Sequence, residues 1–154
     1  MSNNKKTFFS KVLILSMLSM IIISTFIVTV SASSVDSAFN YTLNGQDNYK
    51  TSHREKQNNS CVYMYCKTIT GPTNTYTTKI YGGPRNAGTF DCSWGYTYRF
   101  YKGYQRFMYN SVYEKGYALA AVYANERTSN IVVTGVWSPD SVPQSGVLPP
   151  TDHS

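Results

Sequence analysis

Short runs of β-forming residues recur along the chain, and turn-forming residues separate them about every ten positions. Asn44-Gly45, Gly71-Pro72 and Gly82-Gly83-Pro84 are the clearest separators, because glycine and asparagine enter turns easily and proline cannot donate within a ladder. The expected strands lie at residues 38–43, 49–55, 61–70, 75–81, 94–102, 104–109, 117–126 and 130–137. This spacing predicts an all-β fold, an antiparallel β-sandwich of about seven to eight short strands.

The last two expected strands differ in clarity. YALAAVYANE (117–126) is apolar on both parities, and its alanines also favour a short helix, so the segment stays open between strand and helix. NIVVTGVW (130–137) is apolar on both faces and indicates a central strand. Four prolines follow within seventeen residues. We therefore expect a secreted β-sandwich domain over residues 33–138 and a flexible Pro-rich tail over residues 139–154.

The first 32 residues have the layout of a secretory signal peptide. Lys5, Lys6 and Lys11 precede an apolar stretch from Val12 to Val30, and Val30-Ser31-Ala32 offers small residues for cleavage. An uncleaved membrane anchor is the alternative, because nineteen residues are just long enough to cross a bilayer. Cleavage would leave eleven Lys and Arg against eight Asp and Glu, a net charge of +3 rather than +6. The expected localisation is extracellular.

The chain has three cysteines: Cys61, Cys66 and Cys92. If two of them form a disulfide in an oxidising compartment, one thiol remains free. Cys61 and Cys66 share one expected strand and would lie about 16 Å apart, at roughly 3.3 Å per residue, which is too far for a bridge. If successive strands alternate in direction, Cys61 and Cys92 lie at the same end of the domain. We therefore expect a Cys61–Cys92 disulfide and a free, buried Cys66 thiol.

WGYTYRFYKGYQRFMY (94–109) carries eight aromatic rings in sixteen positions, with three cations between them. A β-hairpin turn at Lys102-Gly103 would place residue 101 opposite 104, residue 100 opposite 105 and residue 99 opposite 106. One face then consists mainly of cross-strand aromatic pairs and is the expected core side. The other face would collect the residues Arg99, Tyr101, Tyr104 and Arg106.

The expected pairing of Arg99 with Arg106 needs an explanation, because like charges directly opposite each other destabilise a sheet. Each guanidinium could stack on Tyr101 or Tyr104 with its charged end in water. Alternatively, the pair could grip an anion, such as phosphate, a polyanionic wall polymer or a lipid head group. The candidate ligand-binding residues are therefore Arg99, Tyr101, Tyr104 and Arg106.

The sequence shows no recognisable catalytic motif. His53 is the only histidine inside the expected domain and lies in a polar run, and the acidic residues are scattered singly, so no nucleophile–base pair or carboxylate pair stands out. A zinc site would need four closely spaced ligands, and GGPRNAG (82–88) lacks the Lys-Ser/Thr of a phosphate-binding loop. We expect no catalytic residue, no metal and no cofactor, and hence no enzyme.

Three stretches together carry a resemblance: DSAFNYTL (36–43), ALAAVYANE (118–126) and IVVTGVWSPDS (131–141). They resemble an uncharacterised group of small exported proteins from Gram-positive bacteria, in which a leader precedes a domain that begins near Asp-x-Ala-Phe and ends near a Gly-x-Trp strand. The likeness covers both ends of the expected domain, whereas its middle departs from the group. Size and export are more loosely similar to lactococcin-type β-sandwich bacteriocins, which act on envelope precursors. Neither resemblance supplies site residues.

The expected function is that of a secreted, non-enzymatic, bacteriocin-like protein that acts at or binds a bacterial cell envelope. Its expected partner is an anionic cell-wall polymer or an envelope lipid head group. A net charge of +3 does not indicate nucleic-acid binding, membrane contact is expected only through an uncleaved leader, and the spare cysteine would allow a dimer. The alternative is an extracellular structural or carbohydrate-binding β-module that uses the same rings with little role for charge.

Overall fold

The computed structural model describes residues 35–45, 49–125, 130–143 and 145–146. The expected signal peptide and most of the expected tail lie outside these residues. The described residues form strands, turns and loops, without a helix, which confirms the predicted all-β class. The strands are β1 (Ser37–Leu43), β2 (Tyr49–Lys50), β3 (Arg54–Glu55), β4 (Cys61–Thr70), β5 (Thr75–Gly83), β6 (Phe90–Asp91), β7 (Tyr98–Tyr101), β8 (Gln105–Met108), β9 (Leu119–Asn125) and β10 (Ile131–Ser141).

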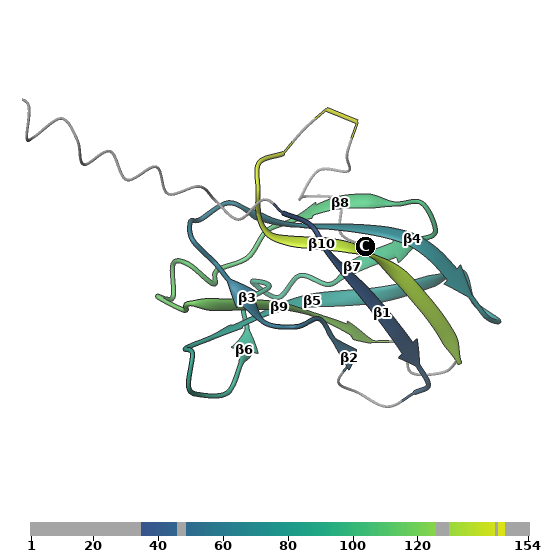
Figure 1. Cartoon of the computed structure of the whole chain (residues 1–154), viewed down its shortest axis with the longest axis horizontal. Coiled ribbons are helices and arrows are strands. Elements are labelled where there is room, and N and C mark those ends of the chain that lie inside the picture. The colour runs from purple at the N-terminus through teal and green to yellow at the C-terminus, as the bar shows by residue number, and fades with distance from the viewer. Residues whose placement is uncertain (1–34, 46–48, 126–129, 144, 147–154) are drawn as a thin grey trace, which may run out of the picture. The chain divides into compact units, whose positions relative to one another are not determined.

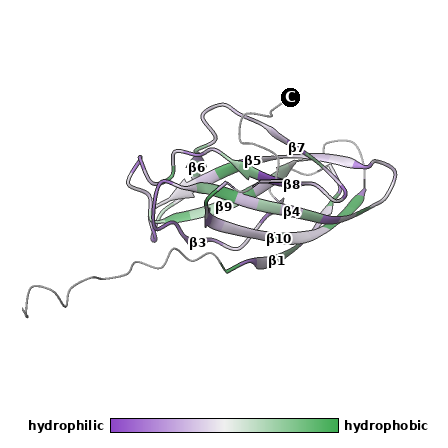
Figure 2. Ribbon diagram, turned by 90° about the horizontal axis from the view of Figure 1, so that it is seen from above, coloured by the Kyte–Doolittle hydropathy of each residue, from purple (hydrophilic) through white to green (hydrophobic). Residues whose placement is uncertain are grey.

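These strands build two antiparallel sheets that face each other in two layers (Figure 1). The four-stranded sheet has the order β1-β10-β4-β8, and the six-stranded sheet has the order β2-β9-β5-β6, with β3 also paired to β9 and β7 also paired to β5. Apolar residues gather in the strands (Figure 2). Both sheets contribute to one hydrophobic core, in which Met64 and Trp137 of the first meet Tyr76 and Phe100 of the second.

Alternating burial along β1 shows how the four-stranded sheet packs on the core. The side chains of Phe39, Tyr41 and Leu43 in β1 are buried, and the residues between them are exposed, as expected for a strand with one face on the core. Gly135 in β10 lies opposite Phe39, and a Cβ there would approach the Phe39 ring to 2.6 Å and the Tyr65 carbonyl oxygen to 2.0 Å. Only glycine therefore fits at this crossing of β1, β10 and β4.

The segment 117–126 contains a strand rather than a helix. β9 pairs with β5 along one side and with β2 and β3 along the other, so both edges of its backbone are hydrogen-bonded. Ala120, Val122 and Ala124 are buried. Sheet pairing on both sides therefore overrides the helix preference of its alanines, which is a weak local preference.

The polar run 49–55 forms two short strands instead of one. Between them, the Thr51 amide donates to the Val122 carbonyl over 3.0 Å, while the Thr51 hydroxyl accepts from the Val122 amide over 2.9 Å. A side chain thus replaces a backbone carbonyl in the ladder to β9. Both strands lie at the edge of the six-stranded sheet, as their polarity predicts.

The end of β10 corrects the expected domain boundary. The strand continues to Ser141, so residues 139–141 belong to the sheet and not to the tail. Pairing with β4 shifts between Ser138 and Ser141, and this irregularity accommodates Pro139, which has no amide hydrogen for a ladder. Asp140 is fully buried and forms a 2.7 Å ion pair with Lys56, whose side chain is also fully buried. This pair links β10 to the chain that follows β3.

Candidate functional site

The turn at Lys102-Gly103 is where the sequence predicts it, but the hairpin pairing is wrong. The Tyr104 amide donates to the Tyr101 carbonyl over 3.1 Å, and Gly103 has a φ of 85°. However, β7 pairs with β5 in the six-stranded sheet, and β8 pairs with β4 in the four-stranded sheet. The chain crosses from one layer to the other at this turn, so that Tyr98 and Phe100 of β7 and Met108 of β8 enter the shared core from opposite sheets.

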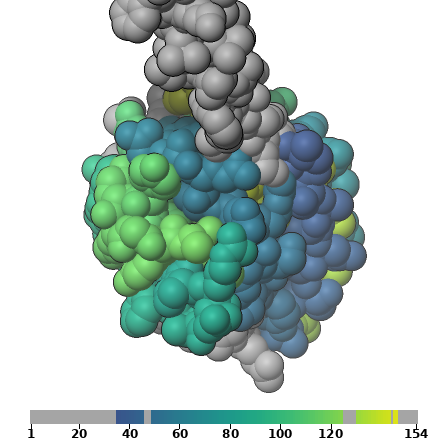
Figure 3. All heavy atoms as spheres, turned by 60° about the vertical axis from the view of Figure 1, so that its left-hand side comes forward, coloured from purple at the N-terminus to yellow at the C-terminus, as the bar shows by residue number. Residues whose placement is uncertain are grey.

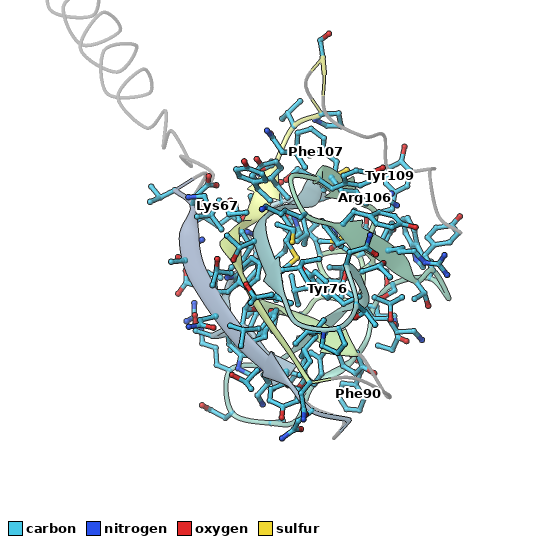
Figure 4. The ribbon with its side chains drawn as sticks, turned by 90° about the vertical axis from the view of Figure 1, so that its right-hand side faces the viewer. Lys67, Tyr76, Phe90, Arg106, Phe107 and Tyr109 are labelled. Carbon is cyan, nitrogen blue, oxygen red and sulfur yellow. The ribbon has the colours of Figure 1, made fainter. Side chains whose placement is uncertain are left out.

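This crossing separates the two arginines that the sequence places side by side. Arg106 is opposite Met64, a core residue, and is only 4% exposed, with its guanidinium carbon 5.9 Å from the centre of the Phe100 ring. Figure 4 shows Arg106 on β8 near Phe107 and Tyr109. Arg99, in contrast, is exposed and pairs with Thr77 of β5. Arg99 and Arg106 therefore point to opposite sides and do not form one site.

Two of the four predicted site residues do lie together. The rings of Tyr101 and Tyr104 are 5.0 Å apart, at an interplanar angle of 56°. Tyr104 is 40% exposed, and Tyr101 shares the outward side of β7 with Arg99. The predicted set thus keeps Arg99, Tyr101 and Tyr104 on or beside the outer surface of the six-stranded sheet and loses Arg106 to the interior.

The disulfide prediction is wrong. Cys61, Cys66 and Cys92 are all free and all buried. Cys66 is a free thiol as expected, and its Sγ lies 3.7 Å from the Thr68 carbonyl oxygen. Burial raises the pKa of the Cys66 thiol to about 11, and it also raises the pKa values of the other two thiols. Buried, protonated thiols react slowly.

Strand register assembles a different set of residues on the outer side of the six-stranded sheet. Lys50 of β2 lies opposite Tyr123 of β9, which lies opposite Lys79 of β5. Because side chains alternate along strands, residues at these positions share one face with their neighbours two positions away. We call this surface the cationic face, and it comprises Lys50, Lys79, Tyr81, Arg99, Tyr101 and Tyr123.

Aromatic rings and cations contact each other on the cationic face. The rings of Tyr81 and Tyr123 stack at 4.0 Å, and the Lys50 amino group lies 5.7 Å from the centre of the Tyr123 ring. The Tyr123 hydroxyl is 2.9 Å from the Thr89 hydroxyl. A cation over a tyrosine ring gains roughly 0.5–1 kcal/mol at an exposed site. These contacts hold the rings in fixed positions on the surface.

The carboxylate of Asp91 offsets part of the positive charge of the cationic face. Lys79 donates to Asp91 over 2.9 Å, and both side chains are more than one third exposed. This hydrogen bond raises the pKa of Lys79. Burial acts to raise the pKa of Asp91, but the hydrogen bonds from Lys79 and Ser93 together lower it. Lys50, Lys79 and Arg99 against Asp91 leave a formal charge of +2 on the surface.

The outer side of the four-stranded sheet is different. Register places there the residues Ala38, Asn40, Thr42, Tyr65, Thr68, Thr70, Val132, Thr134 and Val136. We call this surface the neutral face. Thr68 and Thr134 are hydrogen-bonded across the strands at 2.6 Å, and the adjacent Lys67, whose amino group is 5.9 Å from the centre of the Tyr65 ring, is the charge beside them.

Lys50, Tyr81 and Tyr123 are not among the predicted site residues. The sequence does indicate part of the cationic face. In a strand over TYTTKIY (75–81), side chains alternate between the two faces, so Lys79 and Tyr81 lie on the side opposite to Tyr76 and Ile80. What the alternation does not give is which strands are neighbours. The cationic face draws on residues 50 to 123, and the sheet alone brings them together.

Outside the cationic face, the titratable groups of the described residues do not form a recognisable catalytic site. His53 is exposed, and partial burial and the nearby Lys50 lower its pKa. Within the described residues, no group of three or more His, Cys, Asp or Glu side chains could hold a metal ion. The described part of the chain also has no helix that is long and apolar enough to cross a membrane.

Comparison with protein families gives one match, to the family described as "Protein of unknown function (DUF2712)", over residues 24–141. The chain belongs to the DUF2712 family. The family match ends at Ser141, the last residue of β10, so the DUF2712 region includes the strand end that the sequence assigns to a tail. The expected membership of an uncharacterised family is confirmed to that extent. No curated protein and no solved structure matches the chain.

Proposed function

We propose that this protein is secreted by a Gram-positive bacterium and binds an anionic polymer of the cell envelope without catalysing a reaction. The observation that carries the proposal is the cationic face, where three cations and three tyrosines share one side of a sheet. Two carboxylates lie on the same side, and both are in ion pairs: Asp91 with Lys79 and Glu55 with Arg85. The signal-peptide layout of residues 1–32 supports export. A polymer with regularly spaced phosphate or carboxylate groups is the ligand class that such a surface attracts.

Lys50 and Arg99 carry most of the attraction in this proposal. Both are exposed, whereas the charge of Lys79 is balanced by Asp91. Tyr81 and Tyr123 would hold sugar or glycerol units of the polymer between the charged contacts. Each Lys or Arg near an anionic surface contributes about 1 kcal/mol, so the two exposed cations together would change the dissociation constant about thirtyfold.

The test is binding of the purified protein to isolated cell walls, with and without their phosphodiester polymers. We expect retention on the complete walls, loss of retention after the polymers are removed, and weaker retention as ionic strength rises. The Lys50→Ala/Arg99→Ala variant should bind about thirtyfold more weakly.

Lys67→Ala is the matched control, because it removes an exposed cation from beside the neutral face. Equal retention of the wild type, the control and the double variant would contradict the proposal. Binding to anionic lipid vesicles instead of walls would move the ligand from a wall polymer to a lipid head group.

A bacteriocin-like action is the finer form of this proposal, because a protein that attaches to the envelope of a competitor could block its growth. Growth inhibition that disappears in the Lys50→Ala/Arg99→Ala variant would support this form. Binding to the producing strain's own wall, without inhibition of other strains, would favour a structural role.

A further inference from the structure

A second group of aromatic side chains lies away from the cationic face, where β6 closes one edge of the six-stranded sheet. It consists of two ring pairs, and we call it the aromatic edge: Phe90 with Tyr117, stacked at 5.7 Å, and Trp94 with Tyr109 at 6.4 Å. Phe90 is 53% exposed and Trp94 is 56% exposed. Large rings exposed together on one surface are a common sign of a binding site.

The backbone at Trp94 supports that interpretation. Trp94 has a φ of 51°, and it is the one residue other than glycine with a positive φ among the described residues. A bulky residue is disfavoured in this left-handed conformation. Gly95 follows with a φ of 81°, so the chain turns sharply with the indole directed outward. Strained residues that the fold maintains are concentrated at functional sites.

Hydrogen bonds of the residues before Trp94 hold this strained turn in place. The Ser93 hydroxyl accepts from the Ile80 amide over 2.7 Å and donates to the Ile80 carbonyl, and Ser93 is fully buried. The Ser111 amide and hydroxyl both donate to the Cys92 carbonyl, over 2.8 Å and 3.3 Å. Residues 90–94 and 109–117 are thereby joined, so the backbone segments that carry the rings are held next to each other.

Charge distinguishes the aromatic edge from the cationic face. Asp91 is already counted with the cationic face, and the other charged residues of segments 90–94 and 109–117 are Glu114 and Lys115, whose formal charges cancel. Asp91 is paired with Lys79, and the Lys115 amino group donates to the Asp91 carbonyl over 3.1 Å. A surface without excess cations does not attract phosphate polymers or anionic membranes. Its ligand should therefore be neutral.

We propose that the aromatic edge is a binding site for a neutral polysaccharide, whose sugar rings stack on the two ring pairs. The C–H faces of a sugar ring carry a small positive charge and pack on the electron-rich faces of aromatic rings, and tyrosine hydroxyls can bind sugar hydroxyls at the rim. The proposal does not depend on the cationic face.

The arrangement of the pairs indicates an extended ligand. Figure 4 shows Phe90 and Tyr109 well apart on the molecule. The four residues from Phe90 to Trp94 allow a Cα separation of up to about 13 Å. In Figure 3 part of the surface coloured light green, from the segment that leads into β9, adjoins part of the surface coloured teal, from the segment between β5 and β6. A chain of several sugars would reach both pairs, whereas a single sugar would reach one.

Tryptophan fluorescence offers a direct test, because the protein has two tryptophans and Trp137 is fully buried. The probes are neutral oligosaccharides of two to six units from chitin and from cellulose. We expect the longer ones of at least one series to shift the Trp94 emission to the blue and to protect Trp94 from acrylamide. Calorimetry should show affinity rising with length and little dependence on salt.

Trp94→Gly is the decisive variant, since glycine tolerates the positive φ. It should keep or raise the melting temperature and weaken binding about tenfold or more. Tyr104→Ala, which removes an exposed ring elsewhere, should bind as the wild type does. No length-dependent signal with either series, unchanged binding by Trp94→Gly, or loss of binding in Lys50→Ala/Arg99→Ala would overturn the proposal. A blue shift with neutral lipid vesicles alone would also overturn it.

Discussion

The two sheets use their outer faces in different ways. The neutral face is built from threonine, valine and tyrosine on long strands, and its contacts, such as the Thr68–Thr134 hydrogen bond, stabilise the sheet itself. The cationic face lies on shorter, interrupted strands and carries lysine, arginine and tyrosine. Exposed cations add little to folding. In the proposed function, the six-stranded sheet would present side chains for binding, and the four-stranded sheet would mainly provide support.

Ion pairs should give the largest measurable contrast between the inside of the fold and the cationic face. Lys56→Met leaves the fully buried Asp140 without its cation, which should lower the free energy of unfolding by about 3–5 kcal/mol. Lys79→Met removes a pair whose side chains are more than one third exposed and should change stability by at most about 1 kcal/mol. Urea unfolding of both variants measures the contrast. Similar losses would mean that the cationic face contributes to folding.

Glycine substitutions should separate the packing of the two sheets. In Gly135→Ala the new Cβ would lie 2.0 Å from the Tyr65 carbonyl oxygen, which belongs to the backbone, and we expect a loss of about 3 kcal/mol. In Gly82→Ala the nearest atoms are Val112 methyl groups at 2.8 Å. A side chain can move more easily than backbone, so a loss of about 1 kcal/mol is expected. Thermal melts would show a larger shift for Gly135→Ala, and the reverse order would contradict the closer backbone contact at Gly135.

Alkaline pH should destabilise the interior of the protein. Burial raises the pKa of Cys66 from 9.0 to about 11, so the folded state keeps a proton that the unfolded state loses. The stability that this group contributes is therefore complete below about pH 9 and falls as pH rises towards 11, by no more than about 3 kcal/mol. Burial also raises the pKa values of Tyr41, Tyr76 and Tyr98, which acts in the same direction.

Urea midpoints between pH 8 and pH 11 measure this effect. Cys66→Ala should be less stable than the wild type at pH 8 and should have a flatter pH profile. An unchanged profile would mean that the thiol does not titrate as its burial requires.

The outer faces themselves should give the smallest effects on stability. Lys50→Ala/Arg99→Ala should change the free energy of unfolding by no more than about 0.5 kcal/mol. Thr68→Ala/Thr134→Ala removes a cross-strand pair and should cost about 0.5–1 kcal/mol. Differential scanning calorimetry can rank the two. A larger loss from the cationic pair would give those residues a structural role and weaken the case for binding.

Local pattern predicts much of this fold but little of the site. The run 61–70 is a strand with the expected bounds, and the chain turns at Lys102-Gly103 as expected. The pairing of Arg99 with Arg106 fails, because a tight turn can join neighbouring strands of one sheet or strands of two facing sheets. Both outcomes bury Tyr98 and Phe100, but crossing between the sheets reverses the inward side of the second strand, so that Arg106 and Met108 point inward and Tyr109 is exposed.

The buried ion pair shows a similar limit. Lys56 lies in a polar run and Asp140 follows a proline, which are signs of exposed chain. The Asp140 carboxylate accepts from the Gln57 amide over 3.0 Å as well as from Lys56, and this set of partners makes burial tolerable. A partner more than eighty residues away leaves no local signal. For this reason the sequence analysis ends the domain at residue 138, whereas β10 continues to Ser141.

The sequence by itself determined the all-β class, the positions of most strands and turns, and which side of most strands is apolar, because these depend on neighbours one to four residues away. Only the tertiary structure decided the order of strands, the layer to which each belongs, and hence which outward side chains become neighbours. Those choices depend on packing across the core between residues far apart in the chain. For this reason Arg99 lies on one surface with Lys50 and Lys79, and Arg106 lies inside.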